Sequence, residues 1–289
     1  MYPELIRIGD FTITSFGLMM FLSFIAGSWA LSVQLRRRGM NPELAWDVLA
    51  WVAIGGIAGA KLYYVALHWQ DLLVDPLGSI FSRGGLVWYG GLIGGVSAYY
   101  LFVRKRNLPV ATMYDAVAPG LALAYAVGRV GCFLVGDDYG LPTDSWVGIS
   151  FPNGTPPSTA GYLRSVGADV PAHIPDSAVL AVHPTQLYEV GAALVMFAIL
   201  WRLASRALRP GQHFALYLGM YGVIRFLVEF VRAKGDRFFF GLSTSQVMSL
   251  VLMAIAMYLW QRASARAAEP VVARPDTVAN RGGGRSARR

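Results

Sequence analysis

The sequence predicts an all-α integral membrane protein with about seven transmembrane helices and a small extracytoplasmic head segment. Of the 289 residues, 55% are hydrophobic and only 15% are charged, and the mean hydropathy is +0.46. Soluble domains carry about 25% charged residues. The net charge of +8 does not indicate a nucleic-acid partner, because the basic residues stand in short clusters between apolar runs. That distribution is typical of membrane topology signals.

The first two spans are expected over residues 11–35 and 44–67. Residues 1–10 are expected to form an amphipathic lead-in. The first span ends at three arginines, Arg36 to Arg38, which indicates a retained anchor rather than a cleaved signal peptide. Before the second span, Asn41 is expected to cap the helix, with Pro42 at its first position.

Five further spans are expected along the rest of the chain, over residues 84–103, 111–135, 190–201, 214–231 and 243–260. Residues 69–83 are too mixed to span and are expected at the membrane interface. Residues 84–95 are rich in glycine, which weakens a helix and indicates close packing or a lipid lying against it. The polar segment 136–182, rich in Pro, Gly, Ser and Thr, is expected to form a head or lid.

The domain prediction is a membrane domain over residues 1–261 and a basic, disordered cytoplasmic tail over residues 262–289. Seven spans place the two termini on opposite sides of the membrane. Basic residues are concentrated in the loops near residues 36–38, 104–106 and 202–209, so these loops are expected to be cytoplasmic. The N-terminus and the head are then expected outside.

Arg129 is the residue around which a site is predicted. It lies within a predicted span between Gly128 and Gly131, and an arginine at membrane depth costs at least about 2.5–3.5 kcal/mol. Such a residue faces a polar cavity, although a structural ion pair is the alternative. Arg225 and Glu229 share one helix face and can pair. Two arginines directed at one cavity suit a phosphate, which in a membrane belongs to a phospholipid head group.

Several other polar groups are predicted near the outer ends of the spans: Tyr89, Gln186, Tyr188 and Glu189. The segment from His183 to Gln186 is equally consistent with a simple helix cap. No metal and no cofactor are expected, because the four histidines show no ligand spacing and Cys132 is the only cysteine.

Four blocks, over residues 84–94, 128–137, 183–189 and 225–232, resemble the prolipoprotein diacylglyceryl transferase family in order and over nearly the whole chain. The resemblance implies an enzyme of the bacterial cytoplasmic membrane. Such an enzyme moves the diacylglyceryl group of phosphatidylglycerol to the lipobox cysteine of a preprolipoprotein, forming a thioether and releasing glycerol phosphate. Its expected partners are phosphatidylglycerol, preprolipoprotein signal peptides and the bilayer.

The resemblance also implies site residues. The expected catalytic residues are Arg129, Arg225 and Tyr89. Substrate binding is expected to involve the two arginines together with Glu229, Asp137, Gly140, Cys132, Phe16, Gln186, Tyr188 and Glu189.

Four of these positions depart from the family pattern. Phe16 stands where many members have Tyr, Tyr89 where they have His, Cys132 where they have Asn, and Asp137 where they have Glu. A phenol is a poor general base near neutral pH but a good hydrogen-bond donor to phosphate. Thiol deprotonation is then left to the arginine field, to water or to a carboxylate such as Asp137. The alternative for Tyr89 is an interfacial anchor.

Two other functions remain open from the sequence. One is a divergent lipid transferase with another acceptor, for which the departures leave room. The other is an anion transporter with the arginines as its filter, against which stands the lack of an internal repeat.

Overall fold

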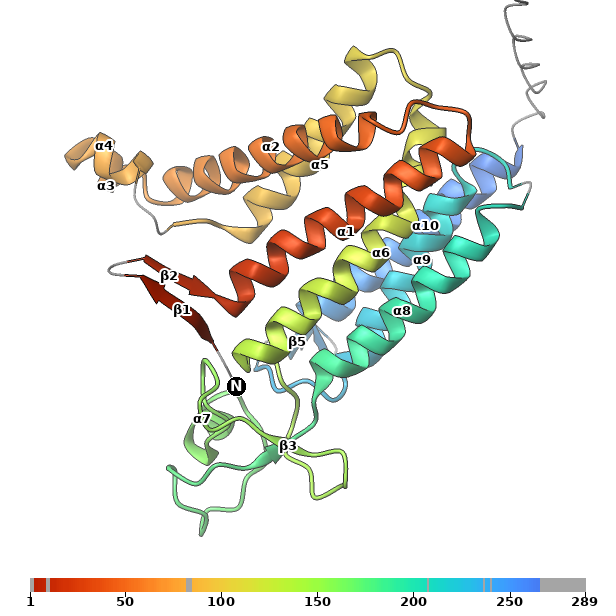
Figure 1. Cartoon of the computed structure of the whole chain (residues 1–289). Helices are drawn as coiled ribbons and strands as arrows, with labels where there is room; N and C mark the ends of the chain where they lie inside the picture. The colour runs from red at the N-terminus through yellow and green to blue at the C-terminus, as the bar shows by residue number, and fades with distance from the viewer. Residues whose placement is uncertain are drawn as a thin grey trace, which may run out of the picture.

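The computed structural model describes residues 3–8, 11–81, 85–206, 208–235, 237–239 and 241–265. Figure 1 shows five long helices lying side by side as a bundle: α1 (Ser15–Arg37), α6 (Val110–Val135), α8 (Thr185–Leu203), α9 (Gln212–Val228) and α10 (Thr244–Ala265). A hairpin of α2 (Leu44–Leu67) and α5 (Trp88–Lys105) lies beside α1. Most of the predicted tail, residues 266–289, lies outside the described residues.

Among the described residues, five helices are long and apolar enough to cross a membrane: α1, α2, α6, α8 and α10. The two other expected spans coincide with α5, of 18 residues, and α9, of 17 residues. A spanning helix needs about 20 residues, with a lower limit of about 17. The protein is therefore a mostly helical, multi-pass membrane protein, and the count of seven spans stays a prediction.

The start of the chain differs from the predicted helix. Residues 11–14, assigned above to the first span, form strand β2 (Phe11–Thr14), which pairs antiparallel with β1 (Glu4–Ile8). Three of these four residues are β-branched and favour an extended backbone. Helix α1 begins only at Ser15, where Oγ1 of Thr14 accepts a hydrogen bond from the Gly17 N–H at 3.1 Å. The side chain of Thr14 therefore caps the helix.

The glycines of the α2–α5 hairpin let the backbones of the two helices pack closely against each other. Close packing was one of the two explanations that the sequence offered for this glycine-rich segment, and a bound lipid was the other. A Cβ on Gly90 would lie 2.4 Å from the Gly59 carbonyl oxygen, and one on Gly94 would lie 2.2 Å from that of Gly55. The hairpin joins the bundle at one end only, through a buried apolar cluster that includes Leu31, Leu35, Tyr99, Phe102 and Met113. Between its two helices lie the short α3 (Trp69–Val74) and α4 (Pro76–Phe81), neither of which is long enough to span.

Asp115 is a buried carboxylate of α6 with a structural role. Its Oδ2 accepts from the Gly211 N–H at 2.7 Å and its Oδ1 from the Phe214 N–H at 2.9 Å, so it satisfies donors at the start of α9. The predicted cap of α2 is wrong: the helix begins at Leu44 after Glu43, with no side-chain cap, and Oδ1 of Asn41 instead accepts from the Glu43 N–H at 2.9 Å in the turn before the helix.

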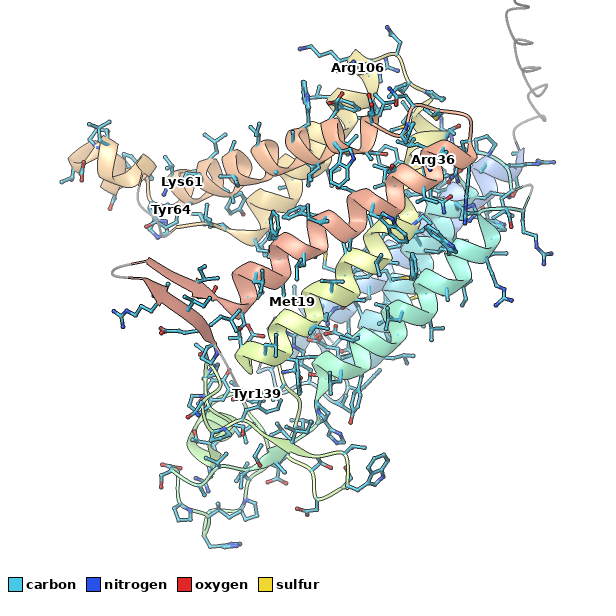
Figure 2. The ribbon with its side chains drawn as sticks, viewed as in Figure 1. Met19, Arg36, Lys61, Tyr64, Arg106 and Tyr139 are labelled. Carbon is cyan, nitrogen blue, oxygen red and sulfur yellow. The ribbon has the colours of Figure 1, made fainter. Side chains whose placement is uncertain are left out.

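Segment 136–182 folds as a compact unit beyond the ends of α6 and α8 (Figure 1). It contains β3 (Ile149–Ser150), α7 (Ala160–Ser165) and β4 (Ala181–Val182) around a buried cluster that includes Tyr139, Phe151 and Leu163. A further two-strand pair, β5 (Arg237–Phe239) and β6 (Leu242–Ser243), precedes α10. Figure 2 places Tyr139 of this unit at the end of the molecule opposite Arg36 and Arg106.

Candidate active site

The ends of α6, α8 and α9 nearest the head bring three predicted residues into contact. Oε2 of Glu189 on α8 forms an ion pair with Nε of Arg129 on α6 at 2.7 Å. The other oxygen of Glu189, Oε1, pairs with Nη1 of Arg225 of α9. Residues that lie 36 and 60 positions from Glu189 in the sequence thus share one buried carboxylate.

Two further ion pairs extend this contact toward the head. Nη2 of Arg225 lies 3.0 Å from Oε2 of Glu229, the pair expected from their spacing of four. Asp138 bridges Arg129, at 2.8 Å from Nη1, and Arg232. We call this set the ion-pair network, and its members are Arg129, Asp138, Glu189, Arg225, Glu229 and Arg232.

The ion-pair network balances three guanidiniums against three carboxylates. The side chains of Glu189 and Glu229 are each 2% exposed, whereas that of Asp138 is 38% exposed. Buried charges persist only when they are paired and hydrogen-bonded, so the deep carboxylates are needed to hold the arginines in place. Asp138 closes the network at its exposed side.

Neighbouring side chains fix the geometry of the network. The Tyr125 hydroxyl, one helical turn before Arg129, donates to Oε1 of Glu189 at 2.7 Å. At the start of α8, Oγ1 of Thr185 donates to the Asp138 carbonyl at 2.6 Å, and Nε2 of Gln186 donates to the Asp137 carbonyl. The head segment is therefore anchored directly to the helix that carries Glu189.

Cys132 and Asp137 lie next to the network. Sγ of Cys132 is 3.6 Å from Nη1 of Arg129. Burial, and then the charge of Asp138, raise the pKa of Asp137 to about 6. Burial alone would raise the pKa of Asp138, but Arg232 and Arg129 outweigh that effect and hold it below its ordinary value. The pKa values of the two adjacent carboxyls therefore shift in opposite directions. Asp138 stays ionised because it is paired with two arginines, whereas Asp137 can exchange a proton near neutral pH.

Ligand atoms of Cys132, Asp137 and Asp138 lie within 4.8 Å of one another, close enough in principle for a metal ion. Asp138 already uses both oxygens on arginines, and Arg129 brings a positive charge to the same spot. We therefore assign no metal to this group.

Three buried acceptor oxygens in or beside the network have no hydrogen-bond partner among the described residues: Asp137 Oδ1, Gln186 Oε1 and Glu229 Oε1. Gln186 and Glu229 are 0% and 4% exposed. A buried acceptor left unpaired is costly, so oxygens of this kind indicate a ligand or water that supplies donors.

The other predicted residues lie at different distances from the network. Phe16, in the first turn of α1, packs beside Gly131, where an added Cβ would lie 3.7 Å from the Phe16 Cα. Met19, one turn later, lies where α1 meets α6 (Figure 2). The Tyr188 hydroxyl lies 3.1 Å from Nδ1 of His183 rather than facing the arginines.

Gly140 contributes its backbone. Its N–H donates to the His183 carbonyl at 2.8 Å, and it pairs as a bridge with Arg232. A Cβ at this position would lie 2.4 Å from the Val231 carbonyl oxygen. Gly140 therefore lets the head approach the chain that carries Arg232, and contact of Gly140 with substrate stays a prediction.

Of the three residues expected to be catalytic, Tyr89 is the one that lies outside the ion-pair network. It lies on α5, is 54% exposed, and packs edge to face on Trp88 with ring centroids 5.2 Å apart. Among the described residues, no hydrogen bond or ion pair joins Tyr89 to the network.

Sequence reasoning did not assign Tyr125, Asp138 or Arg232 to the site. Two signals were present. Tyr125 precedes Arg129 by four residues, which places both side chains on one face of α6. Arg232 follows Arg225 by seven residues, a helical spacing, although α9 ends at Val228 before reaching it. Asp138 carried no comparable signal, because its contacts depend on the turn that follows α6.

Apolar helices that enclose paired arginines and carboxylates, with unpaired buried acceptors among them, are typical of an integral membrane enzyme with a polar site. A family model described as prolipoprotein diacylglyceryl transferase matches residues 3–262. The chain belongs to this family.

Three relatives are each named phosphatidylglycerol–prolipoprotein diacylglyceryl transferase. The protein of Clostridium tetani is 33% identical, over 90% of this chain and 97% of its own length. That of Gloeobacter violaceus is 32% identical over 93% and 96%. That of Bordetella bronchiseptica is 34% identical over 89% and 94%.

Proposed function

We propose that this protein transfers the diacylglyceryl group of phosphatidylglycerol to the lipobox cysteine of preprolipoproteins. The observation that carries the proposal is the single buried carboxylate, Glu189, that holds Arg129 and Arg225 together. Held in this way, Arg129 can present a nitrogen to phosphate oxygens with Arg232 beside it across Asp138. Arg225 keeps Glu189 in place. Fixed guanidiniums bind phosphate oxygens and stabilise the charge that develops on a departing phosphate. The relatives named above act on phosphatidylglycerol and prolipoprotein by their names, and we extend that substrate pair to this chain.

The unpaired acceptors support a hydroxyl-bearing head group. Glu229 and Gln186 each keep one buried oxygen without a partner among the described residues. The glycerol head group of phosphatidylglycerol offers two hydroxyl donors. On this proposal the arginines hold the phosphate while Glu229 and Gln186 accept from the glycerol.

In the reaction, the sulfur of the substrate cysteine attacks the glycerol carbon next to the phosphate. A carbon–sulfur bond forms, the carbon–oxygen bond to phosphate breaks, and glycerol phosphate leaves with the electron pair. The thiol proton needs an acceptor, because the thiolate is the nucleophile. We assign that role to Asp137, whose pKa of about 6 keeps it ionised at neutral pH and within reach of a proton.

The membrane arrangement is part of the proposal. Seven spans, with α5 and α9 added to the five apolar helices, place the N-terminus and segment 136–182 outside and the C-terminal tail in the cytoplasm. The position of Arg36 and Arg106 at the end opposite the head agrees with positive-inside counting (Figure 2). We take the membrane to be the bacterial cytoplasmic membrane, with the site open to its outer face.

The test is transfer by the purified full-length protein. It is mixed with labelled phosphatidylglycerol and a lipobox peptide in detergent, and the peptide is analysed by mass spectrometry for a diacylglyceryl thioether on cysteine. A peptide in which cysteine is replaced by serine is the control. No thioether from a folded protein, or modification of another acceptor, contradicts the proposal.

A further inference from the structure

Asp138 ties two arginines together at the most exposed point of the ion-pair network. Its Oδ2 lies 2.8 Å from Nη1 of Arg129, and its Oδ1 pairs with Nη2 of Arg232. The Asp138 side chain is 38% exposed, whereas the side chains of Arg129 and Arg232 are 12% and 10% exposed. Two nearly buried guanidiniums thus meet one anion that reaches them from the open side.

A carboxylate with one oxygen on each of two guanidiniums reproduces how a phosphate binds a pair of arginines. The fold holds Asp138 in that position. Its backbone is left-handed, with φ of 58°, which aspartate tolerates better than most residues. Its carbonyl is fixed by Oγ1 of Thr185 at 2.6 Å.

The other two carboxylates of the network cannot be exchanged in the same way. Glu189 and Glu229 are each 2% exposed and lie behind the arginines. An incoming phosphate therefore reaches only the place that Asp138 fills. Since the network already balances its charges, adding a phosphate while Asp138 stays would leave excess negative charge at short range.

We propose that Asp138 occupies the lipid-phosphate position between Arg129 and Arg232 in the unliganded protein, and that the substrate phosphate displaces it. This inference rests on the proposed function for the identity of the anion. An internal competitor reduces the apparent affinity for a ligand to the intrinsic affinity multiplied by the fraction of time that the site is free. Asp138 therefore sets how much phosphatidylglycerol is needed to saturate the enzyme.

The test compares Asp138→Asn with the parent protein, and Asp169→Asn serves as control because Asp169 is an exposed carboxylate of the same head segment. The measured quantities are KM for phosphatidylglycerol, kcat, and the inhibition constant of glycerol phosphate. Removing the competitor should lower KM and the inhibition constant together, by about three- to tenfold, while the control matches the parent. Unchanged or raised values in Asp138→Asn overturn the inference, because Asp138 would then only brace the arginines.

A second measurement uses the unmodified protein, in case Asp138→Asn does not fold. A carbodiimide with an amine labels accessible carboxylates, which peptide mass spectrometry then quantifies. Saturation with dihexanoyl phosphatidylglycerol should increase labelling of Asp138 and leave that of Asp169 unchanged. Constant or reduced labelling of Asp138 overturns the inference. A parent protein that makes no thioether contradicts the proposed function instead, so the two failures are distinguishable.

Discussion

Oε2 of Glu189 lies 2.7 Å from Nε of Arg129, across the interface between α8 and α6. The same carboxylate pairs through its other oxygen with Arg225, and its side chain is 2% exposed. Glu189 therefore sets the separation of the two arginines from a position that solvent does not reach.

Replacing Glu189 should disable the site and weaken the fold together. Glu189→Ala leaves two guanidiniums uncompensated at a buried point, and removing one partner of a buried ion pair costs about 3–5 kcal/mol. We expect a lower thermal midpoint and loss of diacylglyceryl transfer, measured on the same preparation. Glu43→Ala, at an exposed residue before α2, should change neither. A Glu189→Ala protein with the parent's midpoint would mean that the arginines do not depend on this carboxylate.

Arg129→Lys should retain little activity. Arg129 uses Nε on Glu189 and Nη1 on Asp138, and a lysine ammonium cannot copy that planar arrangement. We expect a loss of at least about a hundredfold in kcat/KM for Arg129→Ala and for Arg225→Ala. Arg202→Lys, at an exposed residue near the opposite end of α8, is the control. Near-normal turnover by Arg129→Lys would show that the site needs only a positive charge at this position and not the bidentate geometry of a guanidinium.

The pH dependence of transfer should follow Asp137. With its pKa raised to about 6, the carboxylate accepts the thiol proton only above that pH and loses this ability as the pH falls through 6. We expect kcat/KM to fall about tenfold per pH unit below 6. Asp137→Asn should lower the rate at pH 7 and remove this acidic limb. An acidic limb that persists unchanged in Asp137→Asn assigns the base to another group.

Hydropathy predicted the long helices because membrane spans are selected for apolar length. It did not predict the β1–β2 hairpin, since a hydropathy average does not separate residues 11–14, which alternate as Phe-Thr-Ile-Thr, from the apolar helix that follows them. It also did not predict that the α2–α5 hairpin joins the bundle at one end only. That arrangement depends on which faces carry large side chains such as Phe102, which hydropathy does not report.

Of the candidate site, the buried residues on the helices were easier to predict from the sequence than the residues in the turns at its exposed side. Arg129 and the Arg225–Glu229 pair stood out because charges are rare at membrane depth. The sharing of Glu189 between two arginines depends on helix packing, so it was not predictable from spacing. Asp138 and Arg232 meet through the turn after α6 and the segment after α9, where loop geometry decides the contact.

Gln186 and Glu229 should determine selectivity for the glycerol head group. A site built to bind a hydroxyl rejects an analogue that lacks it, because its buried acceptors are then left unpaired. We expect the parent to prefer phosphatidylglycerol strongly over phosphatidylethanol as diacylglyceryl donor. Gln186→Met should reduce that preference at least about fivefold, in line with the loss of roughly one hydrogen bond. Gln34→Met, at a fully buried glutamine far along α1, is the matched control. An unchanged preference would indicate that water satisfies these oxygens.

Substitutions of Tyr89 can decide whether this residue is a membrane anchor or takes part in transfer. Its ring is 54% exposed and packs on Trp88, which suits an aromatic anchor at a membrane interface. Tyr89 lies on the α2–α5 hairpin, which contacts the bundle through a cluster at its other end. Its hydroxyl can therefore reach a lipid phosphate only if the lipid lies between the hairpin and the bundle.

We expect Tyr89→Phe to lower turnover about tenfold or more, since a hydrogen bond to a charged group is worth roughly 1.5–3 kcal/mol. Tyr89→His, which can also donate, should stay active. Trp88→Phe changes the neighbouring ring without removing a hydroxyl and controls for anchoring. Transfer to a lipobox peptide is measured across pH, and if Tyr89→Phe matches the parent at every pH, Tyr89 is an anchor and the phosphate is held by arginines alone.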